Sequence, residues 1–176
     1  MNALVVYESL WGNTAEVARA IAEGLGAGTP ALSTAEATPE RVLAARLLVA
    51  GAPVHNGRLP REQSRAKALE RSQDRERYPD LAAPDHGHPP MADWLAALPH
   101  RADGAFGAAF DTRSMGRWTG SANTRIARAL KRAGYQWRDE PLGFLVVAQD
   151  GPLAPGELDR AQAWGERLSE LVGDGD

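Results

Sequence analysis

The segment from Glu8 to Thr14 carries residues that could hold a phosphate group. It joins a short apolar stretch to a stretch with helical spacing and contains no Lys or Arg. Gly12 permits backbone conformations that are closed to residues with a Cβ, and N–H groups at a helix start bind anions. Ser9, Asn13 and Thr14 add neutral donors. These residues predict a phosphate site; the alternative is an ordinary turn with Thr14 as the helix N-cap.

Two further polar segments, 53–57 and 111–121, also follow apolar stretches and are rich in Gly, Asn, Ser or Thr. In open α/β sheets, ligands bind beyond the carboxyl ends of the strands, where the strand order reverses. We therefore expect all three segments to meet at one edge of a sheet and to form a single ligand site.

Other kinds of chemistry find little support. The chain has no cysteine, which excludes disulfides, thiolate metal sites, iron–sulfur clusters and a cysteine nucleophile. A P-loop pattern is missing, and no nucleophile elbow surrounds Ser9. His86 and His88 lack a third metal ligand at a sensible spacing and indicate a surface loop. The net charge of −3 argues against a dedicated nucleic-acid binder.

The elements that must position these segments alternate along the chain. Apolar stretches predict strands at 3–7, 31–33, 47–52, 105–110 and 143–148, and helical spacing predicts intervening helices over 15–25, from about 39, 90–98, 121–133 and 155–171. The last helix is expected to bury one face, formed by Leu158, Ala161, Trp164, Leu168 and Leu171. Such alternation implies parallel strands with helices on both faces, and right-handed crossovers then give a doubly wound α/β sandwich.

The 176 residues suit one domain, 1–176. The stretch 58–90 is longer than a strand–helix–strand connection requires, which indicates a variable insertion or a lid. Within it, 61–78 could form one charged helix. The sequence contains no run of eighteen apolar residues, which a membrane span would need, and its N-terminus does not resemble a signal peptide. We therefore expect a cytoplasmic protein.

Taken together, the three polar segments resemble those of the flavodoxin family. Residues 7–14 are similar to its signature, in which a Ser or Thr and a variable pair precede Gly-Asn-Thr. Residues 51–57 look like the family's first ring-flanking loop, and 110–113 with 120–122 continue the likeness. The resemblance implies a five-stranded parallel sheet of order 2-1-3-4-5, with FMN as cofactor at its carboxyl edge.

Carried onto this chain, the resemblance implies three groups of cofactor-binding residues and no catalytic residue or metal ligand. The phosphate group would be bound by Ser9, Leu10, Trp11, Gly12, Asn13 and Thr14. One side of the flavin ring would be flanked by Pro53, Val54, His55, Asn56 and Gly57. The other side would be lined by Asp111, Thr112, Arg113 and Trp118.

Two features depart from the family pattern: Trp11 in the first loop, and the aromatic flavin sandwich, which is not obvious here. Trp11 stands where Thr is common; its indole N–H could replace the lost hydroxyl, or the ring could cover the phosphate or simply pack. His55 takes the place of a Trp beside the ring and could donate a hydrogen bond or a proton, because its ordinary pKa is about 6.5. Trp118 could stack on the flavin or pack on the following helix.

Three functions are compatible with these features. The first is FMN-dependent electron transfer between a reductase and an acceptor, which are either redox partner proteins or a small-molecule oxidant. The second is an FMN-dependent oxidoreductase acting directly on a quinone- or porphyrinogen-type substrate, with 58–90 as the substrate-facing lid. The third is a flavodoxin-fold binding module without flavin, favoured by Trp11 and the missing aromatic sandwich. The sequence leaves the oligomeric state open.

Overall fold

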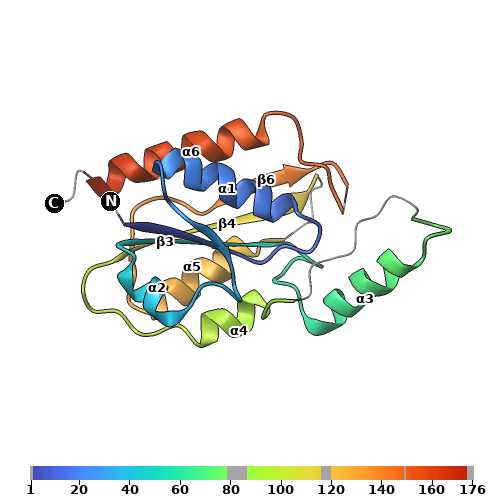
Figure 1. Ribbon diagram of the computed structural model, residues 1–176, viewed down its shortest axis with the longest axis horizontal. Coiled ribbons are helices and arrows are strands. Elements are labelled where there is room, and N and C mark those ends of the chain that lie inside the picture. Colours follow the sequence, from blue (N-terminus) through green and yellow to red (C-terminus); the bar gives the residue numbers. More distant parts are fainter. Residues whose placement is uncertain (1, 79–86, 116–119, 149, 174–176) are drawn as a thin grey trace.

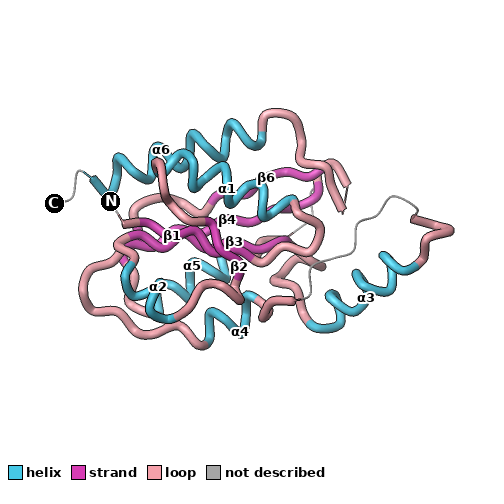
Figure 2. Tube along the Cα trace, viewed as in Figure 1, coloured by secondary structure: helices cyan, strands magenta, loops and turns pink. Residues whose placement is uncertain are grey.

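A parallel sheet forms the centre of the molecule. The computed structural model describes residues 2–78, 87–115, 120–148 and 150–173. The strands lie in the order β2-β1-β3-β4-β5, and β6 also pairs with β4 (Figures 1 and 2). Their bounds are β1 Ala3–Tyr7, β2 Ala31–Ser33, β3 Leu47–Pro53, β4 Phe106–Ser114, β5 Gln136–Trp137 and β6 Leu142–Val146. The predicted doubly wound α/β fold with strand order 2-1-3-4-5 is confirmed.

Helices cover both faces of this sheet. The helices in the described part of the chain are α1 Asn13–Leu25, α2 Pro39–Ala44, α3 Glu62–Gln73, α4 Met91–Ala96, α5 Asn123–Arg132 and α6 Glu157–Gly173, and all of them except α3 pack on the sheet. Figure 1 shows α1 and α6 on one face and α2, α4 and α5 on the other. Each layer buries its own apolar cluster against the sheet. Strand β1 supplies both clusters because its side chains alternate between the two faces, with Val5 in one and Val6 in the other.

The fifth strand position differs from the expectation of a single strand at 143–148. Two short strands, β5 and β6, pair with successive parts of β4: Phe106 lies opposite Gln136, and Phe110 lies opposite Leu142. Strand β4 is also longer than predicted, since it continues past Phe110 to Ser114. The apolar pattern ends at Phe110, but the following residues still pair with both β3 and β6.

The contact face of α6 differs slightly from the predicted one. Leu158 and Leu171 are 42% and 37% exposed, whereas Trp164 and Val172 are buried. The residues that face the sheet and α1 follow a narrower helical stripe, so both predicted end positions lie at its margin.

The stretch 58–90 contributes α3, which is shorter than the predicted 61–78 helix. Figure 1 shows α3 beyond the main body, at the end of the molecule toward which the strands run. In the part of the chain that the structure describes, no helix is long and apolar enough to cross a membrane.

Candidate functional site

The three polar segments meet in one cleft at the carboxyl edge of the sheet. Its lining residues are Ser9, Leu10, Trp11, Asn13, Thr14, Pro53, Val54, His55, Thr112, Arg113, Ser114 and Val146. Four predicted site residues lie outside this lining, namely Gly12, Asn56, Gly57 and Asp111, and Trp118 lies outside the described residues. Val146 was not predicted, because it comes from β6 and its apolar character gives no functional signal.

The first loop is closed by a hydrogen bond from the Gly12 N–H to the Ser9 hydroxyl oxygen at 3.1 Å. Helix α1 begins at Asn13 with Gly12 as its N-cap, so the alternative of Thr14 as N-cap is wrong. Gly12 has a φ of 91°, in the region that favours glycine. The first N–H groups of α1 have no acceptor within the helix and are available to an anion.

Thr14 connects the first loop to the third segment. Its side chain is buried, and its hydroxyl oxygen lies 2.7 Å from that of Thr112 on β4. Only one of the two hydroxyls donates its hydrogen to this bond, so the other hydroxyl can still donate to a ligand. The sequence suggested a polar role for both residues but not their mutual contact.

Trp11 and His55 stack on each other in the cleft, with ring centroids 5.8 Å apart and planes 11° apart. The Trp11 Nε1 is buried and has no hydrogen-bond partner among the described residues. A buried donor without an acceptor costs about 1–3 kcal/mol, so the site fits a ligand that supplies one. Burial lowers the pKa of His55, which keeps its imidazole neutral near pH 7.

The second loop contains a two-residue hairpin turn at Asn56 and Gly57. His55 and Arg58 exchange backbone hydrogen bonds of 2.8 and 3.1 Å, and the two turn residues have φ values of 49° and 74°. Asn-Gly is the preferred pair for such a turn, so the sequence held a signal for it. Gly57 also pairs with Gly120, which joins this loop to the start of α5.

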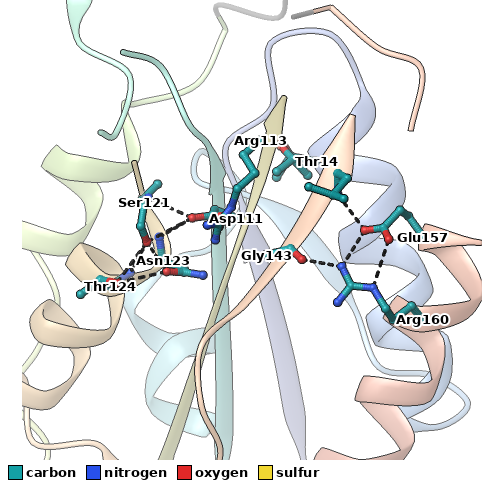
Figure 3. Close-up of polar contacts among 12 residues, drawn as sticks. Thr14, Asp111, Arg113, Ser121, Asn123, Thr124, Gly143, Glu157 and Arg160 are labelled. Carbon is teal, nitrogen blue, oxygen red and sulfur yellow. Dashed lines mark hydrogen bonds and ion pairs between the residues drawn. The ribbon is translucent and has the colours of Figure 1, made fainter. Parts of the chain in front are cut away.

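Asp111 is fully buried and directs its carboxylate to the start of α5 (Figure 3). Its Oδ2 accepts hydrogen bonds from the N–H groups of Ala122 and Asn123 at 2.9 and 3.0 Å. Its Oδ1 pairs with the guanidinium of Arg113 at 2.7 Å. Burial raises the pKa of this carboxyl, and the two N–H groups and Arg113 oppose the rise. Asp111 therefore positions α5 and Arg113.

A fourth segment, which the sequence did not predict, approaches the cleft after β6. The Asn13 side-chain amide donates to the carbonyl of Asp150 at 2.9 Å. Val146 and Leu153 form an antiparallel bridge that turns this segment back. Below it, the Glu157 carboxylate accepts from the Leu145 N–H and Arg160, which ties β6 to α6 (Figure 3). Asn13, expected at the phosphate, thus also positions this segment.

Behind the first loop, a buried charged network connects β1 to the stretch 58–90. Glu8 is 0% exposed, and its Oε1 pairs with the Arg65 guanidinium on α3 at 2.8 Å. Its Oε2 accepts from the Met91 N–H at 2.9 Å. Arg65 also donates to the carbonyl of His88, whose Nε2 lies 3.2 Å from the Ser9 carbonyl oxygen.

This network holds α3 next to the first loop without bringing it into the cleft. None of the described residues of 58–90 lines the cleft. Burial raises the pKa of Glu8, whereas the Met91 N–H and Arg65 oppose the rise. No local pattern indicates this network, since Glu8 and Arg65 lie 57 positions apart in the chain.

The fold is shared with solved flavodoxin-like proteins. An archaeal flavodoxin is 21% identical with a TM-score of 0.65, covering 98% of this chain and 99% of that one. Flavodoxin 2 from Bacillus cereus is 16% identical with a TM-score of 0.63, covering all of both chains. The flavodiiron core from Synechocystis is 17% identical with a TM-score of 0.64, covering all of this chain and 37% of that one. The chain therefore has the flavodoxin-like fold.

No protein-family model matches the sequence, and no curated protein is significantly similar to it.

Proposed function

We propose that this chain binds FMN in the cleft at the carboxyl edge of the sheet and transfers electrons between a reductase and an acceptor. The observation that carries the proposal is the buried, unpartnered Trp11 Nε1 beside the start of α1. A phosphate oxygen there would accept from the indole while the helix N-terminus stabilises the negative charge. Similarity to flavodoxins in fold supports this choice of ligand.

Each lining segment has a defined part in this proposal. Ser9, Trp11 and Thr14 would bind the phosphate as neutral donors, since Arg113 is already paired with Asp111. Pro53 and His55 would flank the ring on one side and Thr112 on the other. The flavin supplies the redox chemistry, and the chain binds and orients it, excludes water and tunes its potential. A neutral His55 would leave the ring's surroundings uncharged near pH 7.

The test compares FMN with riboflavin, which has the same ring but no phosphate. The purified protein is freed of ligand, and binding of each flavin is followed by fluorescence quenching for the native chain and for Trp11→Phe. If Trp11 donates to the phosphate, Trp11→Phe weakens FMN binding by about tenfold or more, as expected for a lost hydrogen bond to a charged group. Riboflavin binding stays within about twofold.

A matched control is Trp137→Phe, because Trp137 lies in β5, away from the cleft lining. Equal losses for FMN and riboflavin in Trp11→Phe would show that Trp11 contacts the ring and not the phosphate. Protein that retains no flavin after incubation with FMN would refute the cofactor proposal and favour the flavin-free binding module.

The second candidate is an FMN-dependent oxidoreductase with a quinone- or porphyrinogen-type substrate; α3 does not supply the expected lid, because none of the described residues of 58–90 lines the cleft. Arg65 and His88 hold the stretch 58–90 directly behind the phosphate loop. Reductive titration separates the two functions: a carrier takes up electrons in two resolved one-electron stages, whereas multiple turnovers with a quinone and a reduced nicotinamide nucleotide would support the enzyme.

A further inference from the structure

A groove between α4 and α5 combines an apolar floor with a basic wall. Its lining residues are Leu59, Ala92, Leu95, Ala96, Arg125, Arg128, Ala129, Lys131 and Arg132. The groove has a volume of about 660 Å³ and is open to solvent on one side. The groove therefore has room for a segment of another chain, and it contains no acidic lining residue.

The four cations all come from α5 and are all exposed. Arg125, Arg128 and Arg132 lie three or four positions apart, so they share one side of the helix and repel one another. None of these three forms an ion pair with a carboxylate among residues 2–78, 87–115, 120–148 and 150–173. Lys131 lies 5.1 Å from the ring of Trp137.

The helix dipole explains the positions of only two of the four cations. Lys131 and Arg132 lie in the last turn of α5, where cations stabilise the helix dipole. Arg125 lies in the first turn, where a cation is unfavourable, and Arg128 lies mid-helix. The same chain carries a net charge of −3, so the positive groove contrasts with the molecule as a whole.

The groove adjoins the loop that borders the cleft. Leu59, on the groove floor, follows the Asn56–Gly57 turn by two positions, and His55 at the start of that turn lines the cleft. A partner in the groove would therefore contact the loop whose other end flanks the cleft. Binding in the groove itself requires no flavin.

We propose that this groove docks an acidic segment of a partner protein, with carboxylates toward the α5 arginines and apolar side chains such as Leu on the floor. Charge complementarity selects carboxylates, and the floor formed by Leu59, Leu95 and three alanines selects apolar side chains between them. A nucleic acid fits less well, because the lining contains no aromatic ring on which bases could stack.

The test uses the full chain and a labelled helical peptide of Glu, Ala and Leu, with Leu at helical spacing, followed by fluorescence anisotropy. Arg125→Glu/Arg128→Glu is expected to weaken peptide binding by about tenfold or more, because two attractions become repulsions. The control Arg19→Glu/Arg41→Glu changes the net charge equally at exposed positions outside the groove and stays within about twofold. A peptide with Ser in place of Leu tests the floor and should bind more weakly.

Amide chemical-shift changes place the peptide on the protein. Changes at α4, α5 and Leu59 support the proposal in both the FMN-free and FMN-loaded protein, so a failure of FMN binding leaves this result intact. Changes elsewhere, or equal losses in the two charge-reversal pairs, would overturn it. Tighter binding of a short DNA duplex, or of anionic lipid vesicles, than of the acidic peptide would also overturn it.

Discussion

Replacing Arg65 by Met removes the guanidinium from a carboxyl group that has no exposed surface. Glu8 would keep one hydrogen bond, from the Met91 N–H, and lose its opposite charge at 2.8 Å. Removing one partner of a buried ion pair is strongly destabilising because the other charge stays buried. We therefore expect Arg65→Met to lower the free energy of unfolding markedly near pH 7.

The magnitude has an upper bound, because the isolated carboxylate can take up a proton. Raising the pKa of a Glu side chain from about 4.3 to 7 or above requires about 1.36 kcal/mol per unit, hence at most about 3.7 kcal/mol at pH 7. The same bound is about 1 kcal/mol at pH 5. A carboxyl group whose pKa is raised in the folded state stabilises the fold at low pH, and this stabilisation is lost as the pH rises toward the raised pKa. The free energy of unfolding of the variant should therefore fall between about pH 5 and 7.

The assay is urea unfolding followed by far-ultraviolet circular dichroism at both pH values, with the slope m checked for constancy. The native chain has the same direction of pKa shift at Glu8 but keeps Arg65, so its pH dependence should be shallower. The matched control is the double variant Glu8→Gln/Arg65→Met, which has no group to titrate there. It should be more stable than Arg65→Met at pH 7 and should lack the additional slope.

Two outcomes would refute this reasoning. One is a loss of stability in Arg65→Met that is the same at both pH values. The other is a double variant no more stable than Arg65→Met at pH 7, which would mean that the buried charge is not what destabilises the protein.

Three further predictions concern the cleft walls. Asp111→Asn should lower the free energy of unfolding by about 2–3 kcal/mol, since α5 loses a charged acceptor; a loss below about 1 kcal/mol in urea unfolding would contradict this. Gly120→Ala should lower the thermal unfolding temperature more than Gly156→Ala does. Both glycines have positive φ, but only a Cβ at position 120 would meet the Gly57 backbone, at 2.4 Å. Equal decreases in unfolding temperature would contradict this close approach. Burial lowers the pKa of His55, so the contribution of its neutral imidazole to the free energy of unfolding should be fully present above about pH 6.5 and should fall as the pH drops through the lowered pKa. His55→Gln should flatten this part of the plot of unfolding free energy against pH, and an unchanged plot would count against burial of the imidazole.

Several features of the candidate site could be predicted because their signals are local. The residue types of 8–14, 53–57 and 111–121 indicated a ligand site, and the carboxyl ends of parallel strands lie at one edge of the sheet. The structure confirms the sheet order that brings these segments together. The assignment of FMN to them stays a prediction, as does the single-domain organisation of 1–176.

The end of β4 and the buried face of α6 were predicted incorrectly because both depend on tertiary contacts. The apolar pattern predicts that β4 ends at Phe110, yet Asp111 continues the strand. The buried Asp111 carboxylate is stabilised by two N–H groups and by Arg113. A hydrophobicity pattern cannot predict such polar partners. Leu158 and Leu171 have helical spacing, but the width of the buried stripe depends on where α6 meets the sheet.

By itself, the sequence determined the alternation of strands and helices, the fold class and the loops that carry polar groups, since each depends on periodicity within a few residues. Only the tertiary structure decided which polar groups meet. Asn13 contacts the carbonyl of Asp150 across 137 positions, and Thr14 meets Thr112 across 98. The stacking of Trp11 on His55 and the buried pair of Glu8 and Arg65 likewise depend on how loops from separate strands fold together. Such contacts join residues with no common local pattern, so no spacing in the sequence encodes them.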